Sequence, residues 1–132
     1  MSQHTPGKTR SFKSGAGSLS SARVVGLSAA NTVTYWATST SMIVGVTYDE
    51  AQQSDAAISV ILDGTAKVTC FASVSAGAIV GPATDGSGKV RERTNPATTT
   101  TAFEKTIGMA LEAGSTDSVI EVALQINNKA SL

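Results

Sequence analysis

Apolar and polar residues alternate along most of the chain after residue 22, and this alternation predicts an all-β protein. Residues two positions apart share one face of a strand, so a period of two marks a strand with one apolar face. The predicted strands cover residues 23–28, 32–38, 42–47, 57–62, 66–72, 78–80, 89–93, 106–111 and 118–126. We therefore expect a compact β-barrel or sandwich of short antiparallel strands.

Two stretches of the chain, residues 43–62 and 107–124, follow the same pattern. Each has an apolar strand that contains glycine, then a polar loop, a hydroxyl–Asp pair and an alternating strand. Self-similarity of this kind indicates a repeated structural unit. The sequence thus predicts a duplicated β-hairpin in which Gly45 and Gly108 are equivalent.

A turn signal, Asp63-Gly64, separates two of the predicted strands. Glycine tolerates the positive φ that a tight chain reversal needs. The sequence therefore predicts a tight hairpin between the strands on either side of this pair.

Length and composition favour one β domain preceded by an arm. A chain of 132 residues is of single-domain size. Residues 1–22 are rich in Ser and Gly and show no sustained alternation, so we expect a flexible basic N-terminal arm there. Residues 23–132 are then the single β domain.

Charge is distributed unevenly, although the chain carries no net charge. Lys8, Arg10, Lys13 and Arg23 precede the first carboxylate, Asp49. Nucleic-acid binding asks for a denser basic patch with aromatic residues among the cations, so we do not expect a nucleic-acid partner. The first residues also lack an apolar run long enough for a membrane span, and no membrane partner is expected.

The residues that usually carry catalysis or bind metals do not cluster in the sequence. His4, the only histidine, lies in the predicted arm, and Cys70 alternates in phase with core positions. Asp55 and Asp117 occupy equivalent repeat positions, where hydrogen bonding to nearby backbone N–H groups is their expected role. We therefore expect no enzyme activity, no cofactor and no metal site.

Aromatic residues mark candidate contact points. Trp36 follows Tyr35 directly, so the two side chains point to opposite faces of a strand, and one leaves the core unless both faces are covered. Phe71 is out of phase with its apolar neighbours. Trp36 and Phe71 are thus candidate interface residues.

Several segments resemble the capsid decoration, or cement, proteins of tailed bacteriophages. The resemblance extends over residues 24–126 and is carried by residues 43–46, 58–60, 63–68, 75–78, 86–90, 107–112 and 119–122. It implies a small β-rich domain on the outside of the shell, commonly trimeric, that bridges neighbouring major capsid subunits. The family offers no active site to transfer.

The resemblance and the basic arm together predict a noncatalytic decoration protein on the outer capsid surface of a virion. We expect a homotrimer that binds the major capsid protein through Lys8, Arg10, Phe12, Lys13 and Arg23. Two alternatives stay open. One is another virion subunit, of the tail tube or the connector, and the other is a small β-barrel enzyme or ligand-binding module.

Overall fold

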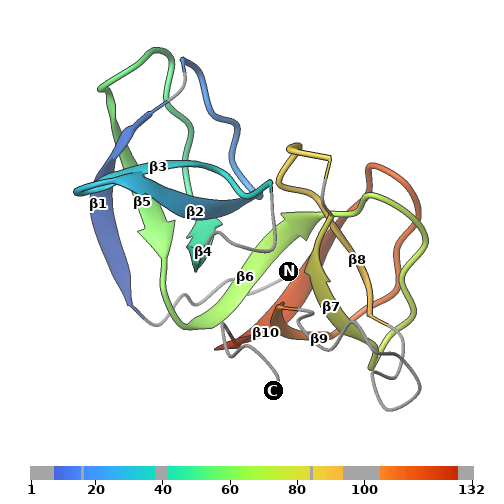
Figure 1. Cartoon of the computed structure of the whole chain (residues 1–132). Helices are drawn as coiled ribbons and strands as arrows, with labels where there is room; N and C mark the ends of the chain where they lie inside the picture. The colour runs from blue at the N-terminus through green and yellow to red at the C-terminus, as the bar shows by residue number, and fades with distance from the viewer. Residues whose placement is uncertain (1–7, 16, 38–41, 84, 94–104, 128–132) are drawn as a thin grey trace.

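A computed structural model describes residues 8–15, 17–37, 42–83, 85–93 and 105–127, and these residues contain strands and no helix (Figure 1). The strands are β1 (Thr9–Ser14), β2 (Val24–Ala29), β3 (Thr32–Tyr35), β4 (Ile43–Thr47), β5 (Ala57–Ile61), β6 (Gly64–Thr69), β7 (Ile79–Pro82), β8 (Val90–Glu92), β9 (Thr106–Ala110) and β10 (Val119–Asn127).

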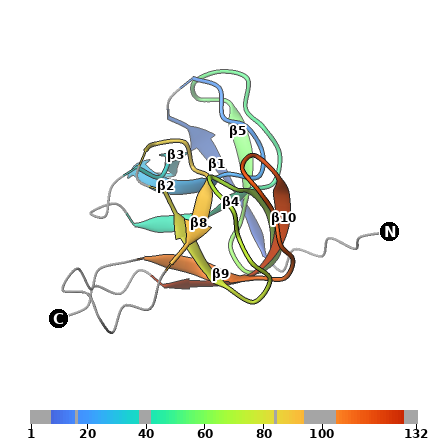
Figure 2. The same cartoon turned by 90° about the vertical axis from the view of Figure 1, so that its right-hand side faces the viewer.

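The strands form two groups that follow one another along the chain. Strands β1 to β5 make a closed barrel in the order β1-β3-β2-β4-β5, and strands β6 to β10 make a second sheet in the order β6-β10-β9-β7-β8. Figure 1 shows the first group at the upper left and the second at the lower right, and Figure 2 shows them from the side. The predicted all-β class is confirmed.

The first strand corrects the prediction of an arm over residues 1–22. Strand β1 pairs antiparallel with β5, and at Lys13 and Ser14 it also pairs in parallel with β3. Phe12 is only 6% exposed and Leu19 only 2%. Part of the predicted arm is therefore a barrel strand, whereas residues 1–7, His4 among them, lie outside the described residues.

The apolar pattern of the sequence did not predict β1, because Phe12 is its only large apolar residue and cations lie close to it on both sides. The Arg10 guanidinium lies over the Phe12 ring, 4.8 Å from its centroid. The ring thus enters the barrel while the guanidinium covers its outer side. One apolar position gives no visible alternation, so sequence periodicity could not identify this strand.

The two groups of strands are copies of one arrangement, which we call the first unit (residues 8–62) and the second unit (residues 64–127). Read from the third strand of each, the orders are β3-β2-β4-β5-β1 and β8-β7-β9-β10-β6. The ring of the first unit closes through the parallel pairing of β1 with β3. In the second unit a single parallel bridge, between Cys70 and Val90, joins the corresponding elements.

Strand register agrees between the units as well. Gly45 of β4 pairs with Val25 of β2, and Gly108 of β9 pairs with Val80 of β7. A Cβ atom on either glycine would overlap a carbonyl oxygen of the next strand, β5 or β10 respectively. The predicted duplicated hairpin is confirmed, and the duplication extends to the five strands of each unit.

The hairpin loops repeat the same backbone geometry. Asp55 and Asp117 have φ values of 66° and 67°, in the left-handed region that aspartate tolerates better than most residues. The Asp55 amide donates to the Ser14 carbonyl and the Asp117 amide to the Cys70 carbonyl, both at 2.8 Å. In each unit the loop is thereby tied to the end of the first strand.

The turn at Asp63-Gly64 joins the units instead of closing a hairpin. Strand β5 pairs with β1 and β4, and β6 pairs with β10, so β5 and β6 are not partners. Gly64 has a φ of 89°, as its turn signal predicts. The local prediction of a turn was right, but the predicted pairing was wrong because turn chemistry does not determine which strands pair.

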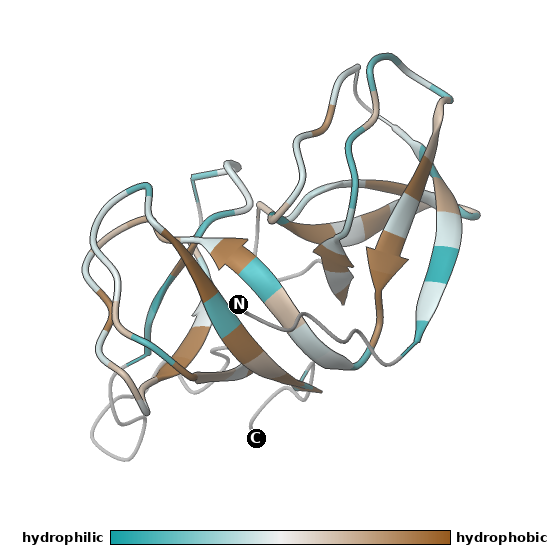
Figure 3. Ribbon diagram, turned by 180° about the vertical axis from the view of Figure 1, so that it is seen from behind, coloured by the Kyte–Doolittle hydropathy of each residue, from teal (hydrophilic) through white to brown (hydrophobic). Residues whose placement is uncertain are grey.

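The core has two clusters of buried side chains. One fills the first barrel and contains Phe12, Leu19, Val25, Val33, Ala51, Ile58 and Val60. The other fills the second unit with Ala66, Val68, Cys70, Val74, Val80, Val90, Ile107, Ala110, Ile120 and Val122, and it is completed by five residues of the first unit, namely Val24, Trp36, Ile43, Val46 and Ile61. In Figure 3 the hydrophobic residues lie mostly along the strands.

Trp36 is therefore a core residue that connects the units, and its predicted role as a surface contact is wrong. It is 2% exposed and belongs to the second cluster. Tyr35, on the opposite face of the chain, packs against the first cluster, and its hydroxyl accepts a hydrogen bond from the Ser20 amide at 2.7 Å. Both faces of this segment are covered, so neither aromatic side chain has to leave the core. Alternation alone could not show that both faces are covered.

Candidate interaction surfaces

Three of the predicted shell-binding cations lie exposed on or beside β1, and we call Lys8, Arg10 and Lys13 the β1 cation cluster. The Arg10 Nη2 donates to Asn31 Oδ1 at 2.7 Å. In the part of the chain that the structure describes, no member of the cluster forms an ion pair with a carboxylate. Because β1 belongs to the barrel, the strand holds these cations on the first unit.

Arg23 has an internal role and does not join the cluster. Its Nη1 donates to the Ser87 carbonyl at 2.8 Å. Its guanidinium lies over the Tyr35 ring, 5.5 Å from the centroid. Arg23 therefore connects the first unit to a loop of the second, and its predicted contact with the shell conflicts with this placement.

The loop that receives Arg23 is held by Asp85 and Ser87. The Ser87 hydroxyl and amide both donate to Asp85 Oδ1, at 2.6 and 3.0 Å. The side-chain hydrogen bond from Ser87 is the main cause that lowers the pKa of Asp85 below its usual value. Beyond this loop, the Val24 amide donates to the Gly88 carbonyl at 2.7 Å, so the loop is fixed against β2.

Among the predicted aromatic contacts, only Phe71 lies at the surface. It is 39% exposed, whereas Phe12 and Trp36 are buried in the two clusters. The prediction that Phe12 contacts the shell is wrong because its ring fills the first barrel. Phe71 stays a candidate contact.

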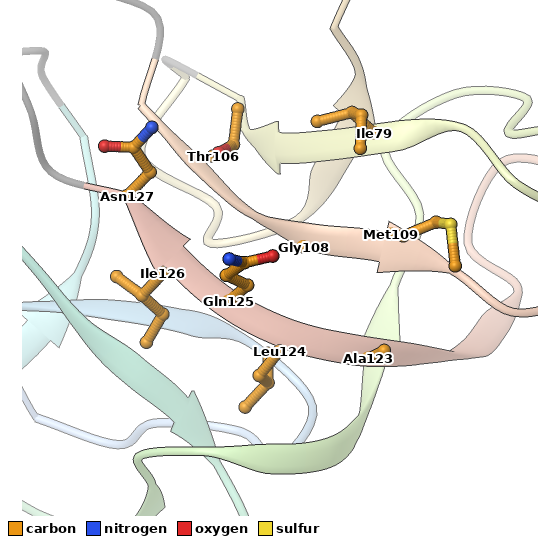
Figure 4. A pocket seen from close by; sticks show the side chains of 9 residues that line it. All are labelled: Ile79, Thr106, Gly108, Met109, Ala123, Leu124, Gln125, Ile126 and Asn127. Atoms are coloured by element: carbon orange, nitrogen blue, oxygen red, sulfur yellow. The ribbon is translucent and has the colours of Figure 1, made fainter.

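A second exposed apolar surface, with more than one residue, lies on the second unit, and the sequence did not predict it. Ile79 and Met109, paired across β7 and β9, are 47% and 41% exposed. They line a groove of about 530 Å³ together with residues of β10 (Figure 4). Ile79 and Met109 each sit beside a buried residue in their strand. A position-by-position alignment of the two units would have identified them.

The described residues contain no group of three or more His, Cys, Asp or Glu side chains placed to hold a metal ion. Cys70 is fully buried, and burial raises the pKa of its thiol. Asp117, one of the repeat aspartates, pairs with Lys89 at 2.6 Å.

Within the described ranges, no helix has the length and apolar character needed to cross a membrane.

Fold and surface together define a class of protein, an all-β chain built from two five-stranded units in tandem. The crystal structure of the head fiber gp8.5 N base in bacteriophage phi29 is similar, with a TM-score of 0.66 over 95% of this chain and 99% of that chain. The two sequences are 14% identical, so the likeness concerns the fold. No protein-family profile matches the sequence, and neither does any curated protein.

Proposed function

We propose that this protein is a noncatalytic structural component of a phage virion, a decoration protein that binds the outer surface of the capsid. The observation that carries the proposal is the fold likeness to the base of a phage head fiber, which extends over nearly the whole of both chains. The resemblance of several segments to capsid decoration proteins supports the same role. The partner would be the major capsid protein, and bridging of its subunits would stabilise the shell.

The β1 cation cluster is the proposed contact with the shell. Its members are exposed and lack carboxylate partners among the described residues, so an acidic partner surface gains attraction without first breaking an ion pair. Exposed charges are screened by salt, and the attraction weakens as ionic strength rises. Phe71 would add an apolar contact where it meets the partner.

A closed homotrimer is the proposed assembly. Symmetric sites on a shell suit closed oligomers, and several weak contacts in one oligomer act together through their high effective concentration. Modest binding by each β1 cation cluster would then give firm attachment of the whole assembly.

The test uses capsids of the parent phage that lack this chain. Full-length protein is added to them, and binding is measured by cosedimentation at low and at high salt. We expect the double variant Arg10→Ala/Lys13→Ala to bind about two- to thirtyfold more weakly at low salt, since exposed charge pairs each contribute roughly 0.2–1 kcal/mol. The difference should shrink at high salt.

The matched control is Lys67→Ala/Arg91→Ala, which removes two exposed cations from the second unit and leaves the β1 cation cluster intact. It should bind like the unaltered protein. Equal binding by both double variants would refute the role of the cluster while leaving capsid binding itself in place. Failure of the unaltered protein to bind these capsids would overturn the proposed function.

A further inference from the structure

Three apolar residues of the first unit form a row across β2, β4 and β5, and they show how one unit packs on the other. Val24 pairs with Val46, and Val46 pairs with Ile61. All three, the first-unit row, are 0% exposed and belong to the cluster that fills the second unit. The first-unit row is thus the outer face of one unit, covered by the other.

The second unit carries the same row at the equivalent positions. Ile79 pairs with Met109, and Met109 pairs with Ala123. These residues, the second-unit row, match the first-unit row strand for strand. Here, however, Ile79 is 47% and Met109 is 41% exposed. The face that buries the first unit against its neighbour is therefore open on the second unit.

The open face contains a groove. The groove of about 530 Å³ is lined by the second-unit row together with Thr106, Gln125 and Asn127. Figure 4 shows Ile79 and Met109 on adjacent strands, with the Gln125 side chain lying close to Gly108. Gly108 brings no side chain into the groove, and a Cβ there would overlap the Ala123 carbonyl oxygen. The pairing of strands thus requires a glycine at this position.

We propose that the second-unit row docks against a second copy of this chain. The inference deepens the proposed function, because it assigns the contact that holds the proposed oligomer together. The equivalent row of the first unit is covered by a unit with the same strand order, so another such unit, from a second copy, is the occupant that we infer. It would present a different face, because the core that receives the first-unit row is already filled within each chain. Charge points the same way, since the residues that line the groove are uncharged and the chain has no net charge to drive copies apart.

An acidic capsid surface fits this groove less well than it fits the β1 cation cluster, because the groove offers no cation to attract it. The two surfaces therefore have separate tasks, with the cluster facing the shell and the row facing another copy.

The experiment measures the mass of the full-length protein by analytical ultracentrifugation over a range of concentrations. We expect the unaltered protein and Met109→Leu to form oligomers and Met109→Glu to remain monomeric, since a buried unpaired carboxylate opposes association. Leu27→Glu places the same charge at a position that is 50% exposed and outside the groove, and it should still associate. Thermal melting shows whether each variant is folded.

A second measurement on the unaltered protein covers the case in which Met109→Glu fails to fold. Hydrogen peroxide oxidation, read by peptide mass spectrometry, should slow at Met109 as protein concentration rises. Oxidation of Met42, 55% exposed and outside the groove, provides the reference for oxidant dose. A monomer at every concentration, a folded Met109→Glu variant that still associates, or unchanged oxidation of Met109 would each overturn the inference. Capsid binding by a monomeric chain would leave the proposed role as a decoration protein standing and would refute the proposed homotrimer.

Discussion

Gly45 and Gly108 show how single residues determine strand packing in both units. At each position the neighbouring strand comes so close that a Cβ would overlap its carbonyl oxygen. Backbone cannot move aside as easily as a flexible side chain, so the strain of an added methyl group stays in the sheet. Their importance could be predicted from the sequence, since both glycines recur at one repeat position.

Replacement of Gly45 by alanine should therefore lower the free energy of unfolding by about 1–3 kcal/mol, the usual cost of overpacking. Gly77→Ala gives the cost of a positive φ alone, because a Cβ there meets nothing within 4 Å while its φ is 86°. Urea denaturation of the two variants measures the difference. A Gly45→Ala variant as stable as the unaltered protein would show that the close approach at Gly45 is not limiting.

The burial of the Cys70 thiol makes the stability of the folded protein depend on pH. Burial raises the pKa of this thiol above its ordinary value of about 8.5. The unfolded chain then loses its proton first as pH rises, so ionisation favours the unfolded state. The thiol's contribution is complete below the ordinary pKa and is lost as pH climbs above it.

We expect the stability advantage of the unaltered protein over Cys70→Ala to shrink between about pH 7 and pH 9.5. Denaturant titrations of both proteins at these two pH values give the difference directly, and other titrating groups cancel because they are common to both. An advantage that stays constant across the interval would contradict the raised pKa.

Among the elements, strands with regular alternation could be predicted and the others could not. Every predicted strand from residue 23 onward overlaps one of the strands β2 to β10. Strand β1 gave no signal because Phe12 is its single large apolar residue. Trp36 was misplaced for the opposite reason, since its segment is covered on both faces.

The Phe12→Ala substitution tests whether residues 9–14 act as a barrel strand or as a flexible arm. The ring is 6% exposed, so its removal leaves a cavity and should cost about 3–5 kcal/mol of stability. Ser11→Ala, at an exposed position of the same strand, should change stability little. Thermal and denaturant unfolding give both values. If neither variant were less stable than the unaltered protein, β1 would contribute nothing to the barrel.

At the scale of the whole molecule, the two units are unequal partners. The first closes its own barrel around its own cluster, whereas the second has its core completed by five side chains from the first. The duplicated hairpin could be predicted from the sequence. The shared core could not, because periodicity shows which residues are apolar but not which unit covers them.

Residues 64–132 expressed alone should therefore lack a cooperative melting transition, while residues 1–62 alone should keep one. Trp36, the only tryptophan, reports on the contact. Its fluorescence should shift to the red in the isolated first fragment and return toward the blue when the second is added. Cooperative melting of the second fragment by itself would show that its core is complete without the first unit.

The junction at Asp63-Gly64 lies close to both the start of the first unit and the last strand of the second. The Lys8 amide donates to Asp63 Oδ1 at 2.7 Å, and Gly64 pairs with Leu124 of the last strand. The start of the first unit and the final strand of the second thus both reach the same link. We therefore expect a circularly permuted chain, opened at this link and joined through the segments that now end it, to keep the strand pairs of both units.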